Sequence, residues 1–184
     1  MPPRAHLHLA GPILLAGLTL LATVACAPPG PPPEAELADG SGATAATVAR
    51  VIDGDTVDLR LGSTTERVRL LGIDTPETVD PDEPVQCFGP EASARTKELL
   101  SPGTPVAVRR DWEARDRYGR LLLYVWRVAD GAFVNRVLVE GGFAEPLAIA
   151  PNVAHRAELA AAARTARAAG VGRWGTCPSD DGQR

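Results

Sequence analysis

Histidine is scarce in this sequence of 184 residues, where His6, His8 and His155 are the whole supply. A zinc site built on imidazole ligands is therefore not expected, and neither is a Ser-His-Asp triad. If the chain catalyses a reaction that needs a general base, a carboxylate is the natural candidate for that role.

An excess of positive charge is also missing. The formal net charge is -4, so the chain does not coat a polyanion by bulk electrostatics. Any affinity for nucleic acid must come from a local basic patch or from a bound metal ion. The hydrophobic content of 45% is ample for a small core, and the length suggests one domain with appendages.

The N-terminus, residues 1–25, has the features of an export signal. Arg4 is its only charge, and small residues surround Cys26. Two processing routes stay open, because Thr23–Cys26 resembles a bacterial lipobox whereas Ala25–Ala27 fits an Ala-x-Ala cleavage site. A retained transmembrane anchor is disfavoured, because the apolar stretch is short and is interrupted by glycine and proline. We expect an exported bacterial protein, either secreted or anchored to the membrane as a lipoprotein through Cys26.

Cysteine is rare, with Cys26, Cys87 and Cys177 as its three positions. In an exported protein Cys87 and Cys177 can pair, which leaves Cys26 as the odd thiol that a lipid thioether would use. By restricting the unfolded chain, such a bridge contributes roughly 4 kcal/mol. The alternative is two unrelated buried thiols. We predict a Cys87–Cys177 disulfide.

The composition divides the chain into four parts. Residues 26–43 are rich in proline, glycine and alanine and are expected to form a flexible tether. A folded domain is expected over residues 44–178, followed by a polar tail at 179–184. Alternating hydrophobicity predicts five strands and helical signals predict three helices, which together make a small α+β barrel. The strands are expected at 47–52, 56–61, 66–73, 105–111 and 121–128, and the helices at 90–100, 134–140 and 152–169, the last capped by Asn152.

Carboxylates follow two of these strands. A hairpin turn centred between residues 63 and 64 predicts that Asp55 faces Asp74. Two like charges so close repel each other unless a cation lies between them, and hard oxygen ligands suit Ca²⁺. Glu77 can approach the same point. Taken separately, each acidic segment could be an ordinary turn or helix cap. Spacing alone leaves Arg69 roughly 16 Å from Asp74 unless the strand bends.

Basic and aromatic residues give weaker signals. Several arginines could line the path of a nucleic-acid strand or could simply form a solvated face. They are Arg109, Arg110, Arg115, Arg117 and Arg120. Trp112, Trp126 and Trp174 are interpreted as packing residues rather than as stacking platforms for bases.

Four motifs in a fixed order carry a family resemblance. They are Asp-Gly-Asp-Thr at 53–56, Arg-Leu-Leu-x-x-Asp-Thr-Pro-Glu at 69–77, Gly-Pro-Glu-Ala-Ser at 89–93 and Tyr-Gly-Arg at 118–120. With this set, residues 48–174 resemble the staphylococcal (micrococcal) nuclease family, also called thermonucleases. The resemblance implies an OB-fold, a five-stranded barrel, with three helices. It also implies a monomer that hydrolyses phosphodiester bonds of DNA and/or RNA with Ca²⁺ and leaves 3′-phosphate products.

The resemblance also assigns roles to residues. It implies that the carboxylates of Asp55 and Asp74 and the carbonyl of Thr75 bind Ca²⁺. Glu77 matches the general base. The remaining assignments are Arg69 and Arg120 as the clamp on the phosphate, with Arg117 and Tyr118 as substrate contacts.

Two departures from the family concern substrate binding. Leu147 and Ile149 stand where the family has tyrosines, so aromatic stacking is lost there and base preference stays open. The loop containing Asp82 and Glu83 is acidic where the family has lysines, and Cys87 suggests that a disulfide pins this loop. We expect weaker substrate binding with the same chemistry. The alternatives are a non-catalytic OB-fold module that binds nucleic acid and a surface lipoprotein that recognises a protein or glycan.

Overall fold

A computed structural model describes residues 42–79 and 84–178 of the chain. The predictions for the export signal, for Cys26 and most of the tether, for Asp82 and Glu83 and for the polar tail lie outside these residues. Within the two described ranges, no helix is both long enough and apolar enough to cross a membrane.

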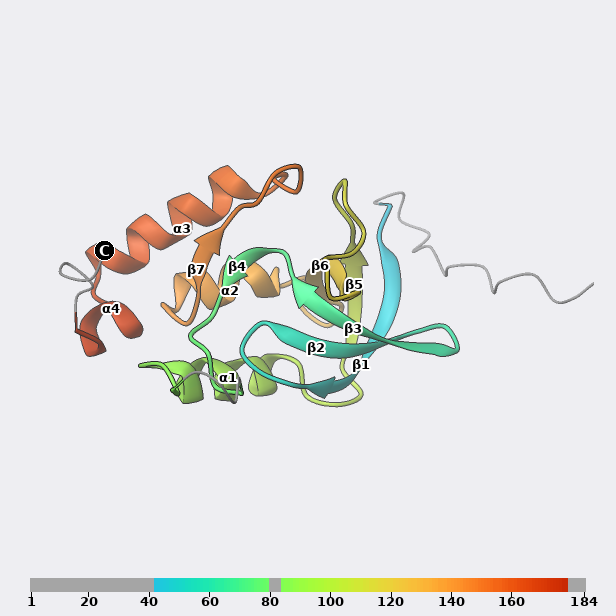
Figure 1. Cartoon of the computed structure of the whole chain (residues 1–184), viewed down its shortest axis with the longest axis horizontal. Helices are drawn as coiled ribbons and strands as arrows, with labels where there is room; N and C mark the ends of the chain where they lie inside the picture. Colours follow the sequence, from blue (N-terminus) through green and yellow to red (C-terminus); the bar gives the residue numbers. More distant parts are fainter. Residues whose placement is uncertain (1–41, 80–83, 179–184) are drawn as a thin grey trace, which may run out of the picture. The chain divides into compact units, whose positions relative to one another are not determined.

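Five strands close a barrel in the order β1-β2-β3-β6-β5 (Figure 1). All neighbours in the barrel are antiparallel except β3 and β6, which run parallel. The strands are β1 (Thr44–Val51), β2 (Thr56–Leu61), β3 (Thr64–Leu70), β5 (Pro105–Arg109) and β6 (Leu121–Arg127). The helices that accompany the barrel are α1 (Gly89–Leu99), α2 (Val134–Glu140) and α3 (Arg156–Ala168). The predicted α+β class, an OB-fold five-stranded barrel with three helices, is confirmed.

The barrel interior is filled by alternate strand residues. Leu59 on β2 and Val68 on β3 are fully buried, and Val106 on β5 and Val125 on β6 are buried with them. Side chains two apart on a strand point to the same face, so the apolar alternation of each strand lines the interior. Each such side chain contributes about 1.5–3 kcal/mol through burial. The core continues under α2 and α3.

A second, two-stranded sheet was not predicted. It pairs β4 (Gly72–Asp74) with β7 (Glu145–Leu147), and Figure 1 shows it beside α2 and α3. Gly72 has a φ of 75°, and a Cβ on it would lie 2.7 Å from a methyl carbon of Leu159. Glycine therefore permits the chain to turn out of β3 at this point. The predicted strand over 66–73 is wrong in its last residues, because the chain leaves the barrel after Leu70.

The predicted start of the last helix is also wrong. Helix α3 begins at Arg156, and no side chain caps it. Asn152 instead binds the backbone of Glu113: its Oδ1 accepts the Glu113 N–H at 2.8 Å and its Nδ2 donates to the Glu113 carbonyl at 3.2 Å. Asn152 therefore joins the segment before α3 to the loop between β5 and β6.

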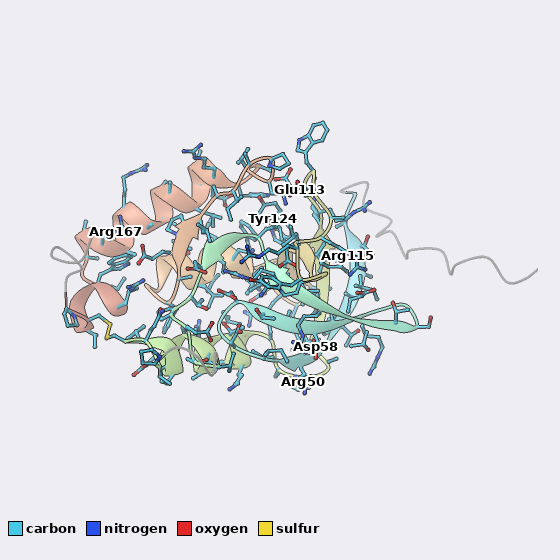
Figure 2. All side chains as sticks on the ribbon, viewed as in Figure 1. Arg50, Asp58, Glu113, Arg115, Tyr124 and Arg167 are labelled. Atoms are coloured by element: carbon cyan, nitrogen blue, oxygen red, sulfur yellow. A yellow bond between two sulfur atoms is a disulfide. The ribbon has the colours of Figure 1, made fainter. Side chains whose placement is uncertain are left out.

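The last helix of the described residues is the short α4 (Arg173–Thr176). The following residue, Cys177, is joined to Cys87 by a disulfide, and the two positions are 90 apart in sequence. Figure 2 draws this bridge as a yellow bond between two sulfur atoms near the start of α1. The bridge connects the segment before α1 to the C-terminal end of the domain.

Candidate active site

The hairpin formed by β2 and β3 differs in register from the prediction. Leu61 pairs with Thr64 across a two-residue turn, so the turn is centred one residue earlier than expected. As a result Asp55 lies opposite Leu70, whose N–H donates to the Asp55 carbonyl at 2.8 Å. The prediction that Asp55 faces Asp74 across the hairpin is therefore wrong.

Asp74 approaches Asp55 by a different route, because the turn at Gly72 brings β4 back toward the start of β2. Nη1 of Arg69 lies 2.9 Å from Oδ2 of Asp55, and Nη2 lies 2.6 Å from Oδ1 of Asp74. Nη1 also donates to the carbonyl of Ile73 at 2.9 Å. The bend that the sequence spacing required is present, and one guanidinium bridges two carboxylates.

The loop between β1 and β2 is shaped by its own acid and by a glycine. Oδ1 of Asp53 accepts the N–H groups of Asp55 at 3.0 Å and Thr56 at 2.7 Å, which folds the loop into an Asx-type turn. A Cβ on Gly54 would lie 2.5 Å from Oγ1 of Thr75, so only glycine lets the two segments approach so closely.

A residue that the sequence did not single out supports this loop from α1. Thr96 is fully buried, and its hydroxyl donates to the carbonyl of Gly54 at 2.6 Å. The buried residues of α1 include Ala92, Thr96 and Leu99, which are spaced three to four apart. That helical period places a threonine on the inward face, and it is the signal that could have identified Thr96.

Asp55 is the most enclosed of the acids, with 8% of its side chain exposed. Its Oδ2 accepts the N–H of Thr75 at 2.8 Å and the hydroxyl of Thr75 at 2.9 Å. Burial raises the pKa of Asp55 and outweighs the lowering by Arg69 and by the bonds from Thr75. Burial and the charge of Asp55 likewise raise the pKa of Asp53. Burial therefore disfavours the ionised form of both carboxylates, and a nearby cation would offset that cost.

The acids line one small cavity of about 200 Å³. Asp55, Asp74, Thr75 and Glu77 all contribute to its wall. Carboxylate and carbonyl oxygens are the hard donors that Ca²⁺ prefers, so the chemistry of Asp55, Asp74 and Thr75 fits this ion. In residues 42–79 and 84–178, however, no three His, Cys, Asp or Glu side chains gather closely enough to hold a metal ion among themselves.

Glu77 points its carboxylate toward the backbone that follows it. Its Oε1 accepts the N–H groups of Thr78 and Val79, both at 2.7 Å. These bonds fix the orientation of the carboxylate at the rim of the acidic cavity. The side chain thus shares the acidic cavity with the two acids that flank Arg69.

Arg120 is oriented by Asp116. Its Nε donates to Oδ2 of Asp116 at 2.7 Å, while Oδ1 of Asp116 accepts the backbone N–H groups of Tyr118 and Arg120, both at 3.0 Å. Burial raises the pKa of Asp116, but the bonds from Arg120 outweigh it, and the pKa lies below its usual value. Asp116 therefore stays ionised and anchors Arg120.

A larger cavity of about 760 Å³ lies beside the acidic one. Arg69 and Arg120 contribute to the walls of both. The rest of the larger wall combines apolar side chains, among them Leu147 and Ile149, with Arg117 and other polar groups. An anion held between Arg69 and Arg120 would thus have an acidic cavity on one side and a half-apolar cavity on the other.

Tyr118 stands at the mouth of the larger cavity, with 68% of its surface exposed. The guanidinium carbons of Arg117 and Arg120 lie 4.7 Å and 5.3 Å from the centre of its ring. Nη2 of Arg117 also donates to the Tyr118 hydroxyl at 2.6 Å. The predicted substrate contacts Arg117 and Tyr118 therefore form one unit with Arg120.

Other sequence predictions have mixed outcomes. Of the arginine group, Arg115, Arg117 and Arg120 line the larger cavity, whereas Arg109 and Arg110 are exposed and do not. The interpretation of Trp112 as a packing residue is wrong, because it is 84% exposed. The other two tryptophans do pack: Trp126 stacks on Phe133 at 4.5 Å between ring centres, and Trp174 packs against Arg167 at 4.2 Å.

Comparison with known proteins agrees with this geometry. The family model described as staphylococcal nuclease homologue matches residues 67–176. The thermonuclease of Staphylococcus intermedius is 42% identical over 127 residues, which cover 69% of this chain and 74% of that protein. The thermonuclease of Staphylococcus hyicus is 38% identical over 120 residues, covering 65% and 69%. Endonuclease YncB of Bacillus subtilis (strain 168) is 42% identical over 98 residues, covering 53% and 46%.

Proposed function

The chain belongs to the staphylococcal nuclease family, and on this premise we propose that it is an exported Ca²⁺-dependent nuclease. It hydrolyses phosphodiester bonds of DNA and/or RNA and leaves 3′-phosphate products. One observation carries the proposal: Arg69 and Arg120 line both the acidic cavity and the larger cavity beside it. This arrangement suits a phosphodiester whose phosphate lies between the guanidiniums and whose nucleoside enters the larger cavity.

The metal ligands proposed are the carboxylates of Asp55 and Asp74 and the carbonyl oxygen of Thr75. When bound, Ca²⁺ supplies positive charge that stabilises the developing negative charge on the phosphate. Asp55 is held by its two bonds from Thr75, so it is oriented before a metal ion binds. Arg69 lowers the repulsion between the two carboxylates.

Glu77 is the proposed general base. It takes a proton from the attacking water as the water oxygen bonds to phosphorus. The bond from phosphorus to the 5′ oxygen breaks, and the leaving 5′ oxygen takes up a proton from solvent water to become a hydroxyl. A positioned base of this kind contributes ~10²–10⁴-fold to the rate. The bonds from the N–H groups of Thr78 and Val79 hold the carboxylate at the rim of the acidic cavity, which supports this role.

Arg69 and Arg120 are the proposed clamp on the scissile phosphate. A guanidinium presents paired N–H donors that match two phosphate oxygens, and these bonds strengthen as charge accumulates in the transition state. Asp116 fixes the Nε edge of Arg120 and so directs the rest of the guanidinium into the cavities.

The larger cavity is the proposed site for the neighbouring nucleoside. Leu147 and Ile149 offer apolar contact to a base where an aromatic ring would offer stacking, while Arg117 and Tyr118 lie on the substrate side of Arg120. Apolar contact without hydrogen-bond readout favours broad base tolerance. We further propose that the folded domain spans residues 44–178, that it acts as a monomer and that Cys26 is either lipidated or removed during export.

Plasmid digestion with Ca²⁺ and with the chelator EGTA tests the function. A nuclease shortens the plasmid in Ca²⁺ and leaves it intact in EGTA. The second candidate, a non-catalytic OB-fold module, would retard the plasmid on a gel without cutting it under either condition. Intact-mass analysis of the mature protein tests the two export routes, because a lipid anchor adds the mass of its acyl chains.

A further inference from the structure

The backbone of Glu77 is bound on both sides by a single residue, Gln86. The N–H of Gln86 donates to the Glu77 carbonyl at 3.0 Å. The side-chain oxygen Oε1 of Gln86 accepts the Glu77 N–H at 3.1 Å. Because both polar groups of the Glu77 backbone are held, the direction in which its side chain leaves the main chain depends on Gln86.

The start of α1 packs closely against Glu77 and Thr78. A Cβ on Gly89 would lie 2.6 Å from Cγ2 of Thr78 and 3.0 Å from the carbonyl oxygen of Glu77. The N–H of Gly89 donates to the carbonyl of Gln86 at 3.0 Å. Gln86 thus lies between Glu77 and the first turn of α1, in contact with both.

The residue after Gln86 is Cys87, which the disulfide ties to Cys177. The N–H of Cys177 donates to the carbonyl of Arg173 at 2.8 Å, and the Arg173 guanidinium forms an ion pair with Glu145. The disulfide therefore attaches the segment that carries Gln86 to a C-terminal end that is itself fixed to β7.

Strand β7 connects this C-terminal end to the segment that lines the acidic cavity. Glu145 on β7 is the register partner of Asp74 on β4. The short segment from Asp74 to Glu77 is consequently held at its first residue by β7 and at its last residue by Gln86. Both supports converge on α4 and the disulfide.

We propose that Gln86 is a positioning residue for Glu77 and that the Cys87–Cys177 disulfide keeps Gln86 in contact with it. The inference rests on the proposed function, in which Glu77 is the general base. A misplacement of about 1 Å in a catalytic group can cost up to about 10²-fold in rate. The contacts of Gln86 described above are with the backbone of Glu77 and of Gly89, so its removal should lower turnover and leave substrate affinity in place.

The first experiment compares Gln86→Ala with Gln86→Glu in the mature chain at saturating Ca²⁺. At pH 8 the new carboxylate is ionised, and one of its oxygens can still accept the Glu77 N–H. We expect Gln86→Ala to lower kcat about 10-fold with KM within about twofold. Gln86→Glu should keep turnover within about threefold of the parent, as estimated from the same positioning argument. The matched control is Glu98→Ala, an exposed change on α1 that should leave kcat unchanged.

The second experiment adds the disulfide. In the Cys87→Ser/Cys177→Ser variant, kcat should fall severalfold, and Gln86→Ala should then cost less than it does in the parent. Such non-additivity is expected when two changes release the same contact. All variants are assayed about 10 °C below the Tm of the least stable one, so that folding does not limit activity.

The outcomes separate the inference from the function on which it rests. A parent protein without Ca²⁺-dependent cleavage would contradict the proposed function. A parent that cleaves while Gln86→Ala keeps its kcat, or while Gln86→Glu is as slow as Gln86→Ala, would contradict the positioning role alone. Strictly additive effects of Gln86→Ala and the serine pair would show that the disulfide does not act through Gln86.

Discussion

The bond from Thr96 to Gly54 connects α1 with the acidic cavity, and Thr96→Val removes it with little change of shape. Valine keeps the volume of threonine but cannot donate a hydrogen bond. Thr96 is fully buried, so the Gly54 carbonyl would lose its donor at 2.6 Å where water does not replace it. Leaving a buried acceptor unsatisfied costs about 1–3 kcal/mol.

Urea unfolding at 25 °C measures this cost, and the chain provides a matched control. Thr64 makes the same type of bond, from its hydroxyl to the carbonyl of Leu61 at 3.0 Å, but on the exposed β2–β3 turn. Thr64→Val should change the free energy of unfolding by no more than about 0.5 kcal/mol, because water can solvate the freed carbonyl. The two variants therefore differ in burial and not in chemistry.

Thr96→Val should also weaken calcium activation, because Gly54 lies between Asp53 and Asp55 and sets how that loop is held. The Ca²⁺ concentration for half-maximal cleavage should rise, whereas Thr64→Val should leave it unchanged. If the two variants lost the same free energy of unfolding, burial would not explain the importance of the Thr96 bond, and the reasoning would fail.

Three further predictions concern the site and the barrel. Glu77→Gln should fold normally and lose about 10²–10⁴-fold in kcat. Cleavage kinetics and circular dichroism check this, with the exposed variant Glu98→Gln as the control. Turnover close to that of the parent would disprove the assignment of Glu77 as the base. Arg120→Lys keeps the charge but not the paired donors, so kcat should fall about 10²-fold, whereas Arg95→Lys on α1 should have no effect. Burial raises the pKa of Asp58, but hydrogen bonds from Arg67 and Arg50 outweigh it and hold the pKa below its usual value of 3.8. The stabilisation from Asp58 is therefore present above about pH 4 and is lost as the pH falls through the lowered pKa. Asp58→Asn should therefore make the free energy of unfolding, measured with urea, fall less steeply between about pH 5 and pH 2. An equally steep fall in the two proteins would contradict this.

The barrel could be predicted from the sequence because its strands carry their own pattern. Alternating apolar residues such as Val57 and Leu59 mark a strand with one buried face wherever they occur. The last residues of the predicted strand at 66–73 also look apolar. Sequence pattern could not show that they leave the barrel, since that depends on the positive φ of Gly72 and on pairing with β7, more than seventy residues later.

The acids that line the acidic cavity could be named from the sequence, but their geometry could not. The acids were identified from their positions after two strands, yet the expected pairing of Asp55 with Asp74 assumed a turn one residue too late. Arg69 bridges the two acids because the chain bends, which local spacing cannot reveal. Thr96 and Gln86 were missed for a related reason, because each acts on a backbone group remote in sequence or across a loop.

The pairing of Asp74 with Glu145 has a consequence for how the protein is made. Every residue of the proposed catalytic set, from Asp55 to Arg120, precedes the last third of the chain, but the strand that holds Asp74 in place comes at Glu145–Leu147. When Arg120 has just emerged from the ribosome, the nascent chain contains the proposed catalytic side chains but not yet β7, the strand that pairs with Asp74. Alignment of Asp74 by β7 therefore waits until residues 145–147 have been synthesised.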